Sequence, residues 1–198
     1  MGPWLRWKGV EVSGWFLLAA ALLLYLDTDG LAFPVAAAFS LHELGHWAAI
    51  RILGGRVRKI RISLAGAELV LDRSRGLSYG RELLCTLAGP GTNFLLAALF
   101  ARWGCPLWAG INWVTGCFQL LPVLPLDGGR GLFCFLCLFQ HPERVEGWLH
   151  RGGWVVSVFL LAAGVAVLAV TKGNFTLLLV GSWVFTVFGR QKDLPTPV

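Results

Sequence analysis

The chain has 198 residues, of which 56% are hydrophobic and 14% charged, and its mean hydropathy is +0.67. This balance is atypical of a soluble domain and indicates a protein that lies in a lipid bilayer. The formal net charge of +6 does not indicate nucleic-acid binding, because the lysines and arginines lie beside apolar segments instead of forming a basic face with interleaved aromatic residues.

Six apolar regions follow one another along the chain, and a membrane span needs about 20 such residues to cross roughly 30 Å of hydrocarbon. The first region is expected to remain in the membrane, because no small-residue cleavage site of a signal peptide follows it. The fourth is interrupted by two prolines and is predicted to be one broken helix. The predicted spans cover about 12–26, 31–53, 83–101, 107–139 (broken), 154–170 and 175–188.

The basic residues predict how these spans are oriented, since Lys and Arg accumulate on the cytoplasmic side of short loops. With the amino terminus inside, only Arg102 and Lys172 of the 17 basic residues fall outside. Splitting the fourth region into two spans is less favourable, because it would bring only Lys172 inside and would move outside Arg144, Arg151, Arg190 and Lys192. We therefore expect a multi-pass membrane protein with both termini in the cytosol.

Between the second and third spans, residues 56–72 carry too many charges to cross a membrane. Ile60, Ile62 and Leu64 alternate with polar residues, as in a half-buried strand, and Gly66 interrupts the pattern before a second apolar run. The sequence therefore predicts an all-α membrane protein with about six transmembrane helices and a small cytosol-side β-hairpin between helices 2 and 3. We expect one transmembrane domain over 1–198.

Residues 42–46, inside the second span, read His-Glu-Leu-Gly-His and have the spacing H-E-x-x-H. Residues four apart share one face of a helix, so both imidazoles can bind one zinc ion while the neighbouring glutamate reaches water on the metal. Ionisable residues inside a span are costly and usually have a partner or a function. His46 lies about 7 Å and His42 about 13 Å along the helix from Arg51 at its cytosolic end. The alternative is a polar notch that only joins helices.

A catalytic zinc ion usually has three protein ligands and an open position for water. Asp127 is the candidate third ligand, because it is the only carboxylate besides Glu43 in an otherwise apolar region, where an anion alone would be costly. It lies three residues from Arg130, a marker of the cytosolic side, so its depth can match that of the histidines. His141 and His150 are expected in a charged surface loop. The alternative for the aspartate is an ordinary Asp-Gly turn.

The third span is interrupted by Gly89-Pro90-Gly91 and by Asn93. This motif predicts a close helix approach that brings the Asn93 amide to the site, where it could hydrogen-bond substrate or a developing oxyanion. The alternative is that these small and polar residues serve only helix packing.

These motifs resemble those of the site-2 protease family of intramembrane zinc metalloproteases, and among its members the compact type typified by stage IV sporulation protein FB. The matches are HELGH at 42–46, AGPGTN at 88–93 and LPVLPLDGGR at 121–130, in the order of the family. The sequence departs from the family at Gln119, where Asn commonly precedes Leu-Leu-Pro. It is expected to lack the CBS domain of the sporulation type and an inserted PDZ domain, so a role in sporulation and regulation by ATP stay open.

The resemblance implies one zinc ion per chain held by His42, His46 and Asp127, with Glu43 as the catalytic base. It also implies supporting roles at the substrate or oxyanion, which fall on Asn93, Gln119, Pro122 and Pro125. The implied activity is hydrolysis of peptide bonds in membrane-bound proteins near the cytosolic side. Implied partners are the bilayer, a substrate such as a transcription factor precursor or an anti-sigma factor, and a membrane inhibitor or activator. A substrate helix must unwind before cleavage, and the strands within 56–72 could hold the opened segment by edge pairing.

Two other interpretations stay open. In an HtpX-like membrane zinc protease, a downstream glutamate completes the site, and the candidates are Glu68 and Glu82. In a non-catalytic metal-binding membrane protein, the same residues would serve a transporter or a scaffold. A transporter usually carries polar groups along a path and repeated halves, whereas this chain concentrates its polar groups at one depth.

Overall fold

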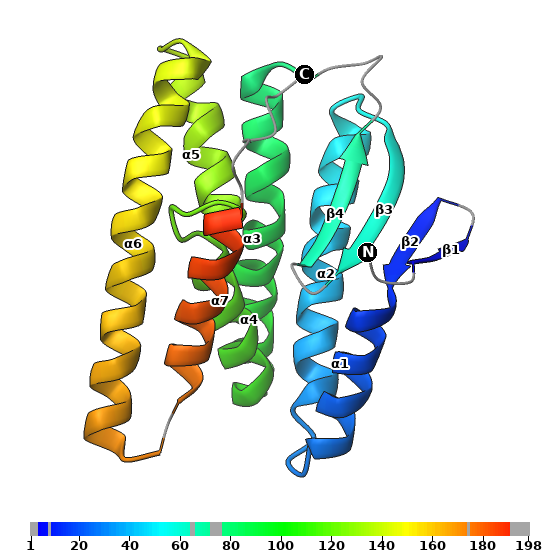
Figure 1. Ribbon diagram of the computed structural model, residues 1–198. Coiled ribbons are helices and arrows are strands. Elements are labelled where there is room, and N and C mark those ends of the chain that lie inside the picture. The colour runs from blue at the N-terminus through cyan, green and yellow to red at the C-terminus, as the bar shows by residue number, and fades with distance from the viewer. Residues whose placement is uncertain (1–3, 8, 64–65, 72–76, 174, 191–198) are drawn as a thin grey trace. The chain divides into compact units, whose positions relative to one another are not determined.

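The computed structural model describes residues 4–7, 9–63, 66–71, 77–173 and 175–190, and all structural statements concern these residues (Figure 1). The chain divides into two compact units, residues 1–118 and 119–197. The first unit contains β1 (Trp4–Trp7), β2 (Val10–Ser13), α1 (Gly14–Leu26), α2 (Ala32–Ile52), β3 (Val57–Ser63), β4 (Gly66–Leu71), α3 (Tyr79–Arg102) and α4 (Pro106–Gln119), which ends at the boundary. The second contains α5 (Asp127–Cys137), α6 (Pro142–Thr171) and α7 (Thr176–Arg190).

The described part of the chain is mostly helical, and its helices follow the six predicted apolar regions. The predicted break in the fourth region is confirmed, because α4 and α5 are separated by residues 120–126. By length and composition, α3 and α6 can cross a membrane, and α1 and the 176–186 part of α7 are shorter apolar helices. The full layout of six spans stays a prediction.

Helix α6 corrects one expectation from the sequence, because it begins at Pro142, well before the apolar run from 154 to 170. Proline at the first helical turn and Glu143 beside it both favour a helix start, the first by its fixed φ and the second by its charge near the N-terminal end of the helix dipole. His141 is consequently the N-cap residue, and His150 lies within the helix instead of in a loop.

The strands form one four-stranded sheet in the order β1-β2-β3-β4. The predicted hairpin is confirmed as β3 and β4, which pair antiparallel with Ile60 opposite Leu69. The amino-terminal strands were not predicted. They form an antiparallel hairpin around Gly9, whose φ of +88° suits glycine, and β2 then pairs parallel to β3 with Val10 opposite Ile60.

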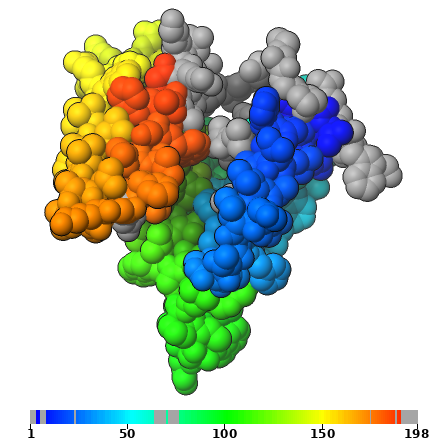
Figure 2. Space-filling view, turned by 60° about the horizontal axis from the view of Figure 1, so that its bottom comes forward, coloured from blue at the N-terminus to red at the C-terminus, as the bar shows by residue number. Residues whose placement is uncertain are grey.

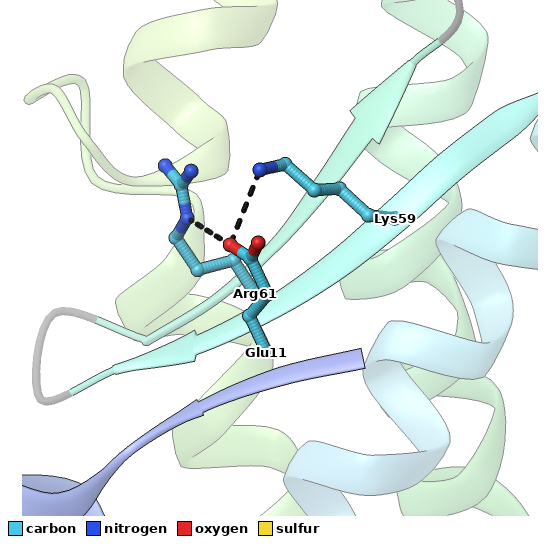
Figure 3. A network of polar contacts seen from close by, with 3 residues as sticks. All are labelled: Glu11, Lys59 and Arg61. Atoms are coloured by element: carbon cyan, nitrogen blue, oxygen red, sulfur yellow. Dashed lines mark hydrogen bonds and ion pairs between the residues drawn. The ribbon is translucent and has the colours of Figure 1, made fainter. Parts of the chain in front are cut away.

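A carboxylate on β2 connects the amino-terminal hairpin to β3 (Figure 3). Glu11 Oε2 accepts hydrogen bonds from Lys59 Nζ at 3.1 Å and Arg61 Nε at 3.2 Å. The Arg61 guanidinium also lies 5.7 Å from the centre of the Trp4 ring on β1. These side chains are partly exposed, so each ion pair contributes roughly 0.2–1 kcal/mol. They add side-chain contacts to the backbone pairing of β2 with β3.

Glycines permit close approach of backbone segments in both units. In the first, a Cβ at Gly45 of α2 would lie 2.9 Å from the Ala88 carbonyl oxygen of α3. In the second, a Cβ at Gly164 of α6 would lie 2.6 Å from Leu178 Cα of α7. Figures 1 and 2 both show α7 lying along α6. Close contacts through small residues are typical of helices that pack against each other in a membrane.

Candidate metal centre

His42 and His46 lie one turn apart on α2, and both are buried. Their Nε2 atoms are 3.0 Å apart, and their rings meet edge to face at 86°. The expectation that both imidazoles share one helix face is therefore confirmed. Two nitrogen ligands of a tetrahedral zinc ion at about 2.0–2.1 Å are roughly 3.3 Å apart, so the observed separation is close to that of a zinc-binding pair.

The other ring nitrogens are both engaged by oxygen acceptors. His42 Nδ1 donates to Asn93 Oδ1 at 2.6 Å, and His46 Nδ1 donates to the backbone carbonyl oxygen of Cys85 at 2.8 Å. An imidazole with its hydrogen on Nδ1 carries a lone pair on Nε2. The two Nε2 atoms lie 3.0 Å apart, so their lone pairs consequently face each other. A cation shared by the two nitrogens stabilises this arrangement, which is therefore suited to a metal site.

Helix α3 leaves room for both rings at Gly89. A Cβ at this position would lie 2.5 Å from His46 Cε1 and 2.8 Å from His42 Cε1, closer than any real side chain permits. Pro90, the next residue, is buried inside α3. The close helix approach predicted from this motif is thus confirmed, and its physical reason is that the imidazoles occupy the volume that a side chain would fill.

Asn93 of α3 is hydrogen-bonded to the His42 ring and to two further groups of the protein. Its Oδ1 accepts from His42, while its Nδ2 donates to the Ala38 carbonyl oxygen at 3.2 Å and to Asn112 Oδ1 at 3.1 Å. Both amide hydrogens are donated within the protein, and the amide oxygen accepts from a histidine. Support of substrate or of an oxyanion by Asn93 stays a prediction. Sequence reasoning missed Asn112 and the Cys85 carbonyl. The sequence offered one signal for Asn112, which is the presence of an amide inside the apolar α4.

The remaining predicted site residues lie on α2 and around the start of α5. Glu43 is half-buried and follows His42 directly on α2. Gln119, the last residue of α4, is half-buried, Pro122 is exposed and Pro125 is half-buried. Asp127 is the first residue of α5 in the second unit and is 9% exposed. The roles assigned to these residues stay predictions.

The glycines after Asp127 explain how α5 can begin there. A Cβ at Gly129 would lie 2.5 Å from the Val123 carbonyl carbon and 2.6 Å from the Leu124 nitrogen. A side chain at this position would therefore collide with the preceding loop. The Asp-Gly-Gly sequence permits segment 120–126 to cross the first turn of α5 closely, which leaves the carboxylate at the amino-terminal end of the helix.

Two sequence relatives share much of this chain, although no protein-family model matches it. The chain is 29% identical over 192 residues to a Mycobacterium tuberculosis protein named zinc metalloprotease Rip3. It is 26% identical over 166 residues to zinc metalloprotease MJ0392 of Methanocaldococcus jannaschii. The alignments cover 87% and 77% of this chain but 48% and 46% of those proteins, so the chain spans about half the length of the curated relatives it matches.

The structure resembles a solved structure described as the site-2 protease from Methanocaldococcus jannaschii, with a TM-score of 0.70. The match covers 98% of this chain and 96% of that one, at 19% sequence identity. At this identity the similarity establishes the fold.

Proposed function

We propose that this chain is a member of the site-2 protease family and an intramembrane zinc metalloprotease, a proposal that its fold and its sequence relatives support. The observation that carries the proposal is that the Nε2 atoms of His42 and His46 lie 3.0 Å apart, while both Nδ1 atoms donate to oxygen acceptors. Ligating histidines usually have such a second hydrogen bond, because it fixes the ring tautomer and orientation.

Asp127 is proposed as the third ligand of one zinc ion per chain. A catalytic zinc ion needs three protein ligands and an open position, and the two histidines supply only two. A buried carboxylate is costly unless it is paired or coordinates a metal.

Glu43 is proposed as the base, because it follows a zinc ligand directly on α2 and its side chain is only half-buried. The bound zinc ion would supply a Lewis acid that activates water and polarises a peptide carbonyl. Glu43 would take a proton from the attacking water and would return it to the amine of the leaving peptide. The buried amide of Asn93 and the carbonyl of Cys85 hold the two imidazoles in place throughout.

The proposed membrane layout has six spans, with α4 and α5 as the two parts of the broken fourth, and both termini in the cytosol. Support comes from the apolar helices α3 and α6 and from the distribution of basic residues in the sequence. This layout puts the sheet on the cytosolic side. The histidines would then lie within the membrane but nearer the cytosol.

The proposed substrates are membrane-bound proteins that are cleaved near the cytosolic side. A transmembrane helix hides its carbonyl groups in hydrogen bonds, so the substrate must unwind locally before water can attack. Strand β4 is an edge of the sheet and could pair with the opened segment. A transcription factor precursor or an anti-sigma factor fits this description, and a membrane inhibitor or activator would control access.

Replacement of Glu43 by glutamine tests the proposal. The full chain, purified in detergent, is incubated with a membrane-tethered substrate, and its zinc content is measured in parallel. The Glu43→Gln variant should keep its zinc and lose cleavage by at least about 100-fold, since general acid–base catalysis contributes about 100- to 10,000-fold. The control variant Glu143→Gln alters an exposed residue in the first turn of α6 and should cleave normally. Normal cleavage by Glu43→Gln would remove this residue from the mechanism.

A further inference from the structure

A chain of buried amides extends from the backbone of α4 to the first histidine of the metal centre. Asn112 Nδ2 donates to the Trp108 carbonyl oxygen at 2.9 Å, and Asn112 Oδ1 accepts from Asn93 Nδ2 at 3.1 Å. Asn93 Oδ1 in turn accepts from His42 Nδ1 at 2.6 Å. We propose that Asn112 is a positioning residue, which orients the Asn93 amide and thereby holds the Nε2 lone pair of His42 toward the metal. This inference rests on the zinc site of the proposed function.

The direction of every hydrogen bond in this chain follows from its first member. The Trp108 carbonyl oxygen can only accept, so Asn112 must present its Nδ2 to that carbonyl and its Oδ1 to Asn93. Asn93 must then present its Nδ2 to Asn112, which leaves its Oδ1 for the imidazole. His42 must donate from Nδ1, so its lone pair is on Nε2. A backbone carbonyl on α4 thus determines the tautomer of a proposed metal ligand on α2.

Burial makes this arrangement strict, because water cannot substitute for a missing partner. His42, Asn93 and Asn112 all have 0% exposed surface. Inside a low-dielectric environment, a satisfied polar network is rigid, whereas a donor left without its acceptor is costly. The second hydrogen of Asn93 is held by the Ala38 carbonyl oxygen at 3.2 Å, so removal of Asn112 would weaken the orientation of this amide without abolishing it.

The packing of α4 against α3 is also shaped for this contact. Gly116 lies one turn after Asn112, and a Cβ there would lie 3.1 Å from the Phe94 ring and 3.4 Å from Asn93 Cβ. The absence of a side chain at Gly116 therefore permits α4 to approach α3 at the level of the amide pair. Glycine beside the buried Asn112 is what a close contact between the two amides requires. Packing alone does not require an amide at position 112.

The alternative is that Asn112 only joins α3 to α4, as buried amides do between membrane helices. Two substitutions separate these roles. Asn112→Leu keeps a similar volume but removes the acceptor for Asn93. Asn112→Asp keeps an acceptor for Asn93 and, when its carboxyl group is protonated, a hydroxyl donor for the Trp108 carbonyl. The matched control is Thr115→Val on the same helix, since the buried Thr115 donates its hydroxyl to the Ile111 carbonyl oxygen in a bond that is partly buried, like the bond from Asn112 to the Trp108 carbonyl.

The experiment measures zinc dissociation constants for the purified full chain and its variants, together with the visible absorption spectra of their cobalt-substituted forms. Groups that hydrogen-bond to metal-ligating histidines typically contribute 10- to 100-fold in metal affinity. Asn112 acts one step farther from the metal, so Asn112→Leu should bind zinc roughly 10-fold more weakly. Its cobalt spectrum should shift. Asn112→Asp and Thr115→Val should both resemble wild type in affinity and spectrum.

Three outcomes would overturn the inference: Asn112→Leu binding zinc as tightly as wild type, Asn112→Asp losing as much affinity as Asn112→Leu, or Thr115→Val losing affinity equally. If Asn112→Leu does not fold, the comparison of Asn112→Asp with Thr115→Val still decides, because an orienting role requires Asn112→Asp to keep the wild-type spectrum. Failure of the wild-type protein to bind zinc or to cleave would instead overturn the proposed function.

Discussion

Gly89 of α3 faces the ring of His46 of α2 so closely that a Cβ at this glycine would lie 2.5 Å from His46 Cε1. The glycine is therefore part of the candidate metal centre, although it has no side chain to bind a metal. Its role is to leave space in which two imidazoles can turn toward one point. The same helix supplies the Asn93 amide and the Cys85 carbonyl that orient these rings.

Replacement of Gly89 by alanine should lower zinc affinity by at least about 10-fold, because the new methyl group displaces both imidazoles and disturbs their outer hydrogen bonds. Gly91 provides the matched control, since it lies in the same motif and a Cβ there would contact nothing within 4 Å. Zinc titration of both variants in detergent measures the effect. Equal zinc affinity for Gly89→Ala and Gly91→Ala would show that the close approach does not matter for the metal.

The two outer hydrogen bonds should respond differently to substitution. Asn93→Ala removes the acceptor of His42 Nδ1 and should weaken zinc binding about 10- to 100-fold. Cys85→Ala should leave zinc affinity unchanged, because His46 Nδ1 donates to the backbone carbonyl of this residue and not to its sulfur. Zinc dissociation constants of the two variants provide the comparison. A large loss of affinity in Cys85→Ala would indicate a direct role for the thiol.

The third ligand can be identified by zinc content. Asp127→Asn should reduce bound zinc below one ion per chain after dialysis, because an amide is a weaker ligand than a carboxylate. Glu68→Gln and Glu82→Gln should retain the wild-type amount, since in the proposed site neither coordinates the metal. An HtpX-like site would give the opposite result, with full zinc in Asp127→Asn and loss in one of the two glutamate variants.

The ion pairs of Glu11 should matter for the sheet and not for the metal. Glu11→Gln weakens the contacts to Lys59 and Arg61, which are partly exposed, so the expected loss of stability is at most about 1 kcal/mol. Hydrogen exchange of β2 and β3 should become faster while zinc affinity stays the same. If exchange in these strands is unchanged, backbone pairing alone holds the two hairpins together.

The positions of the helices could be predicted from the sequence because each follows a continuous apolar run bounded by charges or prolines. The early start of α6 could not be predicted. Residues 142–153 include several charged residues, and the expected length of a membrane span is counted from apolar residues only. The strand pair β3–β4 was predictable from its local alternation. Strand β2 was not, because it pairs in parallel with β3, about 50 residues away, and short parallel strands depend on distant partners.

In the metal centre, the spacing of His42 and His46 was sufficient to predict that their rings meet. The roles of their neighbours were not predictable, because they depend on how α3 and α4 pack against α2. The sequence suggested that Asn93 hydrogen-bonds substrate or an oxyanion, or that it serves only helix packing. It did not suggest the contacts seen in the structure, where the Asn93 oxygen accepts from His42 and its amide hydrogens are donated to Ala38 and Asn112. A motif identifies the residue type, and tertiary contacts determine which of its atoms are used.

The central claim is that one zinc ion is bound by His42, His46 and Asp127. Zinc-edge X-ray absorption of the purified full chain tests it most directly, with wild type and Asp127→Asn compared. We expect one zinc ion per wild-type chain, with two imidazole nitrogens and oxygen ligands at about 2.0–2.2 Å, and a changed oxygen shell in the variant. A wild-type spectrum without two imidazoles, or a variant spectrum identical to wild type, would contradict the claim.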